Sequence, residues 1–256
     1  MKQRGWGIWR CSGILGAFVY LLLLWPTIAL AKTQANIIPS GGINGHHIKV
    51  IYRGLRLTDD YMKKTFDLEF HRPFEIHATT RQAQTEEDIR SGRIAGQANE
   101  GRVLVYVAED SGDGNVLYTT AHEMIHQYQV VAVGSMDVLG RNMWFIEGMA
   151  DVLAARIIAP LAPGFDKTFR KGARKAAKEG LNLAAVTSAD GWQHSFHSKE
   201  DPYRRADAAV LYLTDHYPLM KLFAYLQELR EVSAEEALRR VYGLSIAELE
   251  KAAARG

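Results

Sequence analysis

Cysteine is almost absent from this chain. Its single cysteine, Cys11, lies in an apolar N-terminal stretch, so no thiol occurs after that position. This absence excludes disulfide bonds from the body of the protein, and it excludes metal sites built on cysteine thiolates. A metal site in this chain therefore needs histidine and carboxylate ligands.

The chain also lacks internal repeats, low-complexity tracts and a strong excess of charge. It carries 31 basic and 29 acidic residues, a formal net charge of +2. Three of the basic residues precede position 32, and the rest of the chain has 28 basic residues against 29 acidic ones. A nearly neutral body argues against nucleic acid as the main partner. With 256 residues, 47% of them hydrophobic, the chain can bury one substantial core.

The N-terminus has the pattern of a targeting segment. A basic start (Lys2, Arg4 and Arg10) precedes an apolar stretch, and Ala29-Leu30-Ala31 resembles a signal-peptidase site. We therefore expect a signal peptide over residues 1–31, a linker over 32–45 and one domain over 46–256. The alternative is an uncleaved membrane anchor, with membrane contact confined to residues 11–31. Both interpretations place the domain outside the cytoplasm, in the periplasm or secreted.

The segment His122-Glu123-Met124-Ile125-His126 has two histidines four positions apart. In an α-helix, side chains at this spacing leave the same face, with Cβ atoms roughly 5–6 Å apart, so both imidazoles can bind one zinc ion. Glu123 can then reach a water on the metal without binding the metal itself. This is the HExxH pattern of zinc proteases.

Two acidic residues follow the motif in a second apolar helical run. Glu147 and Asp151 stand one turn apart among apolar neighbours, where an unpaired carboxylate is costly to bury. Because a catalytic zinc takes three protein ligands and keeps one position open, Glu147 is the expected third ligand. Asp151 is expected to accept the free ring N–H of a ligating histidine and so orient the ring.

Together, His122-Glu123-x-x-His126 and Glu147-x-x-x-Asp151 resemble the gluzincin metallopeptidases, the group of thermolysin and aminopeptidase N, and in particular the short peptidase MA-like domains. The resemblance implies an α+β, zincin-like fold. In that fold a small mixed β-sheet packs on the active-site helix, and a mainly helical C-terminal lobe carries the glutamate. It also implies one Zn²⁺ per chain and a peptide or protein substrate.

The resemblance suggests two further functional positions. In gluzincins an edge strand near the metal pairs with the extended substrate, which makes Gly96, Gln97 and Ala98 candidates for substrate binding, although an ordinary hairpin arm explains them equally well. A tyrosine before an apolar helix assists the oxyanion in aminopeptidase N-like enzymes. Tyr203 stands in a similar segment, with Tyr212 as the alternative.

Local patterns predict a strand-rich part over residues 46–114 and a helical part over 115–256. We expect strands at 47–55 and 74–79, helices at 58–70, 85–91, 115–131, 203–216 and 219–229, and a hairpin with arms 93–98 and 102–108. Ser233 and Ser245 open two capping boxes, and Gly243 ends the helix between them. The region 160–202 is the least regular; it contains a basic run at 169–178 and an expected loop at 190–201 with His194 and His197.

These features favour a zinc peptidase that hydrolyses peptide bonds with metal-activated water. Aminopeptidase N-like enzymes grip the substrate's free amino terminus with a glutamate, and Ala98 stands at the matching position here, with Glu100 two residues later. The expected activity is therefore that of an endopeptidase. Two alternatives are a catalytically idle zinc-binding module of the cell envelope and a zinc hydrolase acting on another bond.

Overall fold

The computed structural model describes residues 35–256 except 71–72, 84–95, 100 and 199. The chain divides into two units, Met1–Lys32 and Thr33–Gly256, and the hydrophobic core lies within the second unit. The predicted signal peptide and the predicted helix at 85–91 fall outside the described residues. No helix within the described ranges is both long enough and apolar enough to cross a membrane.

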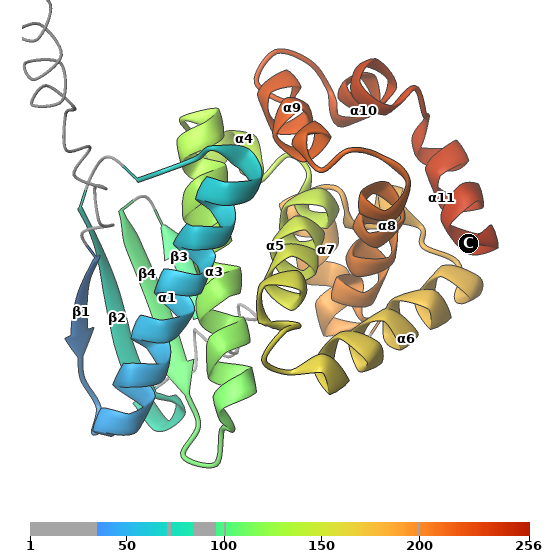
Figure 1. Cartoon of the computed structure of the whole chain (residues 1–256). Helices are drawn as coiled ribbons and strands as arrows, with labels where there is room; N and C mark the ends of the chain where they lie inside the picture. The colour runs from blue at the N-terminus through green and yellow to red at the C-terminus, as the bar shows by residue number, and fades with distance from the viewer. Residues whose placement is uncertain (1–34, 71–72, 84–95, 100, 199) are drawn as a thin grey trace, which may run out of the picture. The chain divides into compact units, whose positions relative to one another are not determined.

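Within the described ranges, four strands form one mixed sheet in the order β1-β2-β4-β3 (Figure 1). Strands β1 (Ala35–Pro39), β2 (Phe74–Thr80) and β4 (Arg102–Val107) run parallel to one another. Strand β3 (Gly96–Asn99) pairs antiparallel with β4 and lies at the edge of the sheet. A short 3₁₀ turn (Arg81–Ala83) follows β2.

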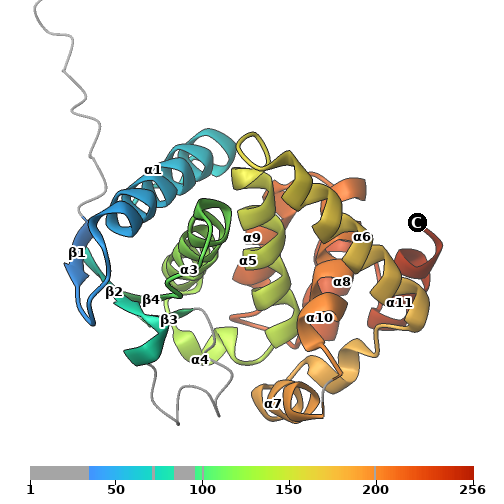
Figure 2. The same ribbon diagram turned by 90° about the horizontal axis from the view of Figure 1, so that it is seen from below.

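The two faces of the sheet differ in polarity because side chains alternate along each strand. Ile76, Val103 and Val105 are fully buried, whereas Glu75 and His77 face outward. The His77 Nε2 and Glu75 Oε2 atoms lie 2.8 Å apart. Helices α1 (Gly45–Phe66) and α3 (Asp113–Val133) lie side by side on the buried face (Figure 2).

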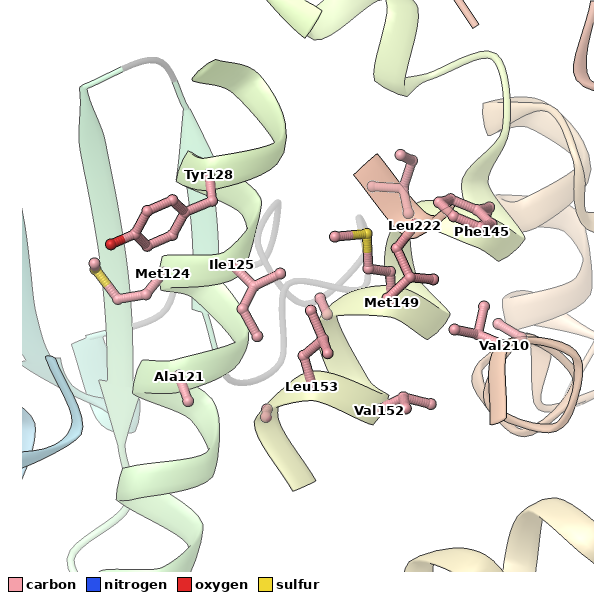
Figure 3. Close-up of a cluster of buried hydrophobic side chains, with 14 of the residues drawn as sticks. Ala121, Met124, Ile125, Tyr128, Phe145, Met149, Val152, Leu153, Val210 and Leu222 are labelled. Atoms are coloured by element: carbon pink, nitrogen blue, oxygen red, sulfur yellow. The ribbon is translucent and has the colours of Figure 1, made fainter. Parts of the chain in front are cut away.

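Helix α3 is buried on nearly all sides, because it packs on α1, on strands β3 and β4, and on α5 (Met143–Ile158). Figure 3 shows Met124 and Tyr128 directed toward the sheet and Ile125 directed toward α5. Met149 and Leu153 of α5 are fully buried opposite that face. The helix ends at Gly134, whose positive φ of 75° suits glycine.

The remaining helices form the C-terminal part around α5: α4 (Met136–Leu139), α6 (Pro163–Glu179), α7 (Ala189–His197), α8 (Pro202–His216), α9 (Met220–Glu228), α10 (Ala234–Tyr242) and α11 (Ile246–Arg255), with a 3₁₀ turn at Leu183–Val186. Helix α8 packs on α5, and α6 packs on the other side of α8. A Cβ atom on Gly148 of α5 would lie 2.6 Å from the carbonyl oxygen of Ala206, so only glycine permits this approach of α8.

The expected α+β class is confirmed in coarse terms, and all four described strands precede α3, although the long helix α1 lies among them. The predicted helix at 115–131 and the hairpin of β3 and β4 are also present. Ser245 forms the full capping box, Ser233 caps α10 through its hydroxyl, and Gly243 ends α10.

Four local predictions are wrong. The helix expected at 58–70 is the second half of α1, which runs from Gly45 and ends at Phe66. Residues 47–55 are helix, not strand, because buried positions such as Ile51, Leu55 and Met62 recur at helical spacing through the whole of α1. The expected linker 32–45 contains β1, which pairs with β2. The expected loop at 190–201 is largely α7, which Ser188 caps by accepting a hydrogen bond from the Gly191 amide.

The close contact at Gly148 yields a stability prediction. Gly148→Ala should lower the free energy of unfolding by about 1–3 kcal/mol, because the added methyl overlaps the α8 backbone and α8 must shift. Gly164→Ala in α6 is the matched control, since nothing lies within 4 Å of its Cβ position. Urea unfolding of both variants measures the difference, and equal stability would contradict this packing.

Candidate metal centre

Two neighbouring helices carry the predicted ligands. His122 and His126 lie one turn apart on α3, and Glu147 lies on α5, which packs against α3. The Nε2 atoms of the two histidines are 3.0 Å apart. The Glu147 Oε2 atom lies 3.4 Å from His122 Nε2 and 3.6 Å from His126 Nε2. Their side chains are only 11, 10 and 14% exposed in that order. This buried group can hold a metal ion.

Hydrogen bonds on the outer side of each imidazole orient the two rings. His122 Nδ1 lies 2.7 Å from Asp151 Oδ1, and His126 Nδ1 lies 2.7 Å from the side-chain oxygen of Gln129. The Gln129 amide nitrogen in turn donates to the carbonyl oxygen of Ile146 at 2.9 Å. Because these oxygens accept the Nδ1 protons, each Nε2 atom is directed toward the shared centre, where a neutral imidazole would offer its lone pair to a metal ion. The donor set therefore fits a metal ion.

Glu147 is held ionised at this centre. Burial alone would raise the pKa of its carboxyl, but the imidazoles of His126 and His122 outweigh that effect and bring the pKa well below its ordinary value. Burial acts to lower the pKa of His122, but the charge and hydrogen bond of Asp151, together with Glu147 and Glu123, raise that pKa well above its ordinary value. The group thus combines two imidazole nitrogens with one carboxylate oxygen, a set typical of zinc.

Glu123 lies beside the metal group without being part of it. Its side chain is 5% exposed and lines the cavity with His122. Burial raises the pKa of Glu123 to about 7, although His122 and His126 act in the opposite direction. A carboxyl group with this pKa can both accept and release a proton near neutral pH.

Strand β3 reaches the same point through Gly96. A Cβ atom on Gly96 would lie 2.4 Å from Glu123 Oε1, so a side chain at this position would displace the Glu123 carboxylate. The structure therefore brings the predicted substrate strand and the predicted base together. Ala98 is 8% exposed and pairs with Val103 of β4, and Gln97 pairs with Leu104. Glu100 lies outside the described residues.

A cavity of about 390 Å³ opens beside the metal group between β3, α3, α5, α6 and α8. Tyr203 lines it together with His122 and Glu123, and its ring packs edge-on against Trp192 at 4.9 Å. Burial, followed by the charge of Glu147, raises the pKa of Tyr203 well above its ordinary value, so its hydroxyl keeps its proton and can donate it in a hydrogen bond. Tyr212 instead stacks on His216 beside a different cavity.

Three residues of the site went unnoticed in the sequence. Gln129 orients His126 as described above, and the Tyr118 hydroxyl donates a hydrogen bond to Asp151. Asp207 of α8 is 2% exposed, and burial together with the nearby Asp151 charge raises its pKa well above the ordinary value. Their spacing on α3 was the available signal for two of these residues. Tyr118 stands one turn before His122, and Gln129 stands three residues after His126.

The two histidines of region 160–202 do not join this centre. His194 and His197 lie on α7, both exposed, and neither lines the cavity.

The sequence matches no protein-family model, and comparison with curated proteins also finds no significant match. The geometry of the centre is therefore the basis for the functional proposal below.

The geometry predicts which residues retain the metal. His122→Ala, His126→Ala and Glu147→Ala should each abolish stoichiometric metal binding, because each removes one of three converging ligand atoms. Asp151→Asn should weaken metal affinity by about 10–100-fold through the loosened His122 ring. Elemental analysis and a competitive chelator titration measure both effects. His197→Ala is the control and should bind normally; full occupancy in Glu147→Ala would remove that residue from the ligand set.

Proposed function

We propose that this protein is a zinc-dependent metallopeptidase of the gluzincin type with a zincin-like fold. The supporting observation is the convergence of His122, His126 and Glu147 on one point, with Glu123 buried beside them and left out of the ligand set. Two imidazoles and one carboxylate with an open position suit catalytic zinc, one ion per chain. A purely structural site would instead be closed by a fourth protein ligand.

The chemistry that zinc supplies in such a site is Lewis acidity toward a water molecule and toward a carbonyl oxygen. Glu123 accepts the proton of the attacking water and delivers it to the departing amine, a role that its pKa of about 7 suits. The Tyr203 hydroxyl donates a hydrogen bond to the carbonyl oxygen as negative charge develops there. Asp151 and Gln129 keep the two imidazole rings in place throughout.

The edge strand supports a peptide as the substrate. Among the described residues, no strand pairs with the outer edge of β3, and an unpaired edge of this kind is where an extended peptide can add to a sheet. Gly96 on this strand lies against Glu123, so a peptide paired with residues 96–98 would pass directly over the base. A catalytically idle module has no use for this arrangement of base, strand and cavity. The export signal predicted from the sequence supports a reaction outside the cytoplasm.

Replacing the base tests the mechanism. Glu123→Gln should keep the metal but lower hydrolysis of a quenched peptide library by about two to four orders of magnitude, because an amide cannot accept the proton. Chelation should abolish hydrolysis by the unaltered protein, and added zinc should restore it. The exposed Glu109→Gln variant is the control. Undiminished turnover in Glu123→Gln would rule out the mechanism, and cleavage of esters alone would favour the non-peptide hydrolase.

A second prediction concerns the position of the cleaved bond. Ala98 cannot pair with a substrate ammonium group, so one peptide offered with a free and with an acetylated amino terminus should be cleaved at similar rates. Mass spectrometry of the products identifies the bond. Strict dependence on the free amine would contradict the endopeptidase proposal, and loss of that dependence in Glu100→Gln would identify the residue responsible.

A further inference from the structure

Helix α6 exposes a continuous row of positive charge. Five of its basic side chains are exposed to solvent: Lys167, Lys171, Arg174, Lys175 and Lys178. Four of them follow the spacing i, i+4, i+7 and i+11, which keeps them on one helical face. At 1.5 Å per residue the row is roughly 16 Å long. We refer to these five residues as the α6 basic face.

This charge is largely uncompensated. Lys175 lies 3.6 Å from Glu179, a pair in which both side chains are more than half exposed. Within the described part of the chain, the other four cations form no ion pair. Arg170 of the same helix, in contrast, is engaged by Asp166 and Asp215 and so does not belong to the basic face. A local excess of this kind, on a chain whose body is near neutral, produces a directed positive potential.

The orientation of α6 is fixed by its opposite side. Phe169, Ala173 and Ala177 are buried, and the helix packs on α8 and α11 through this side. Both views show α6 on the outside of the helical part, with α8 on its inner side (Figures 1 and 2). The basic face therefore points away from the core.

We propose that the α6 basic face docks on an anionic phospholipid bilayer. Four of the five cations are lysines, a residue type depleted in protein–protein interfaces, and the row itself contains no aromatic or aliphatic anchor of the kind that a protein partner needs. A charged membrane surface attracts such a row without specific contacts. Leu161, in the turn before α6, is 42% exposed and can enter the interfacial layer.

A neighbouring cavity adds to this assignment. Arg174 and Lys178 also line a hollow of about 320 Å³ between α6, α8 and α11. Apolar side chains that include Ala173, Ala177 and Leu211 form part of its lining, and the one carboxylate side chain in the lining, Asp215, is paired with Arg156 and Arg170. Cations beside apolar side chains suit a lipid phosphate followed by the start of an acyl chain.

Docking would also define where the proposed peptidase works. Phe165 and Thr168 of α6 line the cavity of the metal centre. Because an α-helix with its side chains is about 10–12 Å across, the bilayer surface would lie within about one helix diameter of the α6 residues that line that cavity. If the proposed function holds, the docked enzyme would cleave segments of substrate that lie close to the membrane. The docking itself does not depend on catalysis.

Vesicle flotation tests the docking. The unit 33–256 contains the hydrophobic core, so it can be assayed without the apolar N-terminal segment. It should float with vesicles of phosphatidylcholine and phosphatidylglycerol, should not float with phosphatidylcholine alone, and should be released by high salt. Lys167→Gln/Lys171→Gln/Lys178→Gln should weaken the binding by roughly 100-fold.

A matched variant separates the α6 basic face from net charge. Lys49→Gln/Arg53→Gln/Arg56→Gln removes the same charge from the exposed side of α1, and it should leave vesicle binding nearly unchanged. Metal content and thermal unfolding confirm that both variants are folded. Equal losses in the two variants, or equal binding to neutral vesicles, would overturn the proposal. Preferential binding to duplex DNA over anionic vesicles would overturn the choice of lipid. Glu123→Gln tests the peptidase activity alone, because it should abolish hydrolysis and leave flotation unchanged. The two proposals can therefore fail independently.

Discussion

The packing of α3 against α5 is the contact on which the candidate metal centre depends. Through it, two imidazoles from one helix and a carboxylate from the other come within 4.8 Å of one another in a buried setting. A buried carboxylate is strongly unfavourable unless it is paired, and Glu147 is paired only because the histidines of α3 face it. The apolar contact between the helices, in which Ile125 and Leu153 take part, therefore stabilises the fold and also brings the ligands together.

Two glycines allow neighbouring elements to approach α3 and α5 closely on either side of the candidate centre. On one side of the centre Gly96 lets β3 lie against Glu123, and on the other Gly148 lets α8 approach α5. Helix α8 contributes Tyr203 and Asp207, so the second approach places the wall of the cavity opposite the metal group. Both glycines are needed because no space remains for a side chain, and their own backbone conformations are ordinary.

A second layer of polar groups surrounds the ligands. Asp151 accepts from His122 and from Tyr118, and burial together with the Asp151 charge raises the pKa of the neighbouring Asp207 well above its ordinary value. Gln129 connects His126 to the α5 backbone. Each imidazole is thus held by an oxygen acceptor that is itself fixed, which keeps Nε2 pointed at the centre. This second layer comes from three helices, and only Asp151 belongs to a recognisable motif.

The sequence by itself determined the parts of this protein that depend on local spacing. The positions of His122, Glu123 and His126 follow from the geometry of one helical turn, and the apolar run around Glu147 marked it as a buried carboxylate. The start of α1 was mistaken for a strand because its β-branched residues outweighed a period that becomes clear only over 22 residues. Only the tertiary structure decided that Gly96 reaches Glu123, that Tyr203 and not Tyr212 faces the centre, and that Gln129 and Asp207 support it. These contacts join segments distant in sequence or select among equivalent local patterns, and packing in three dimensions is the only interaction that distinguishes them.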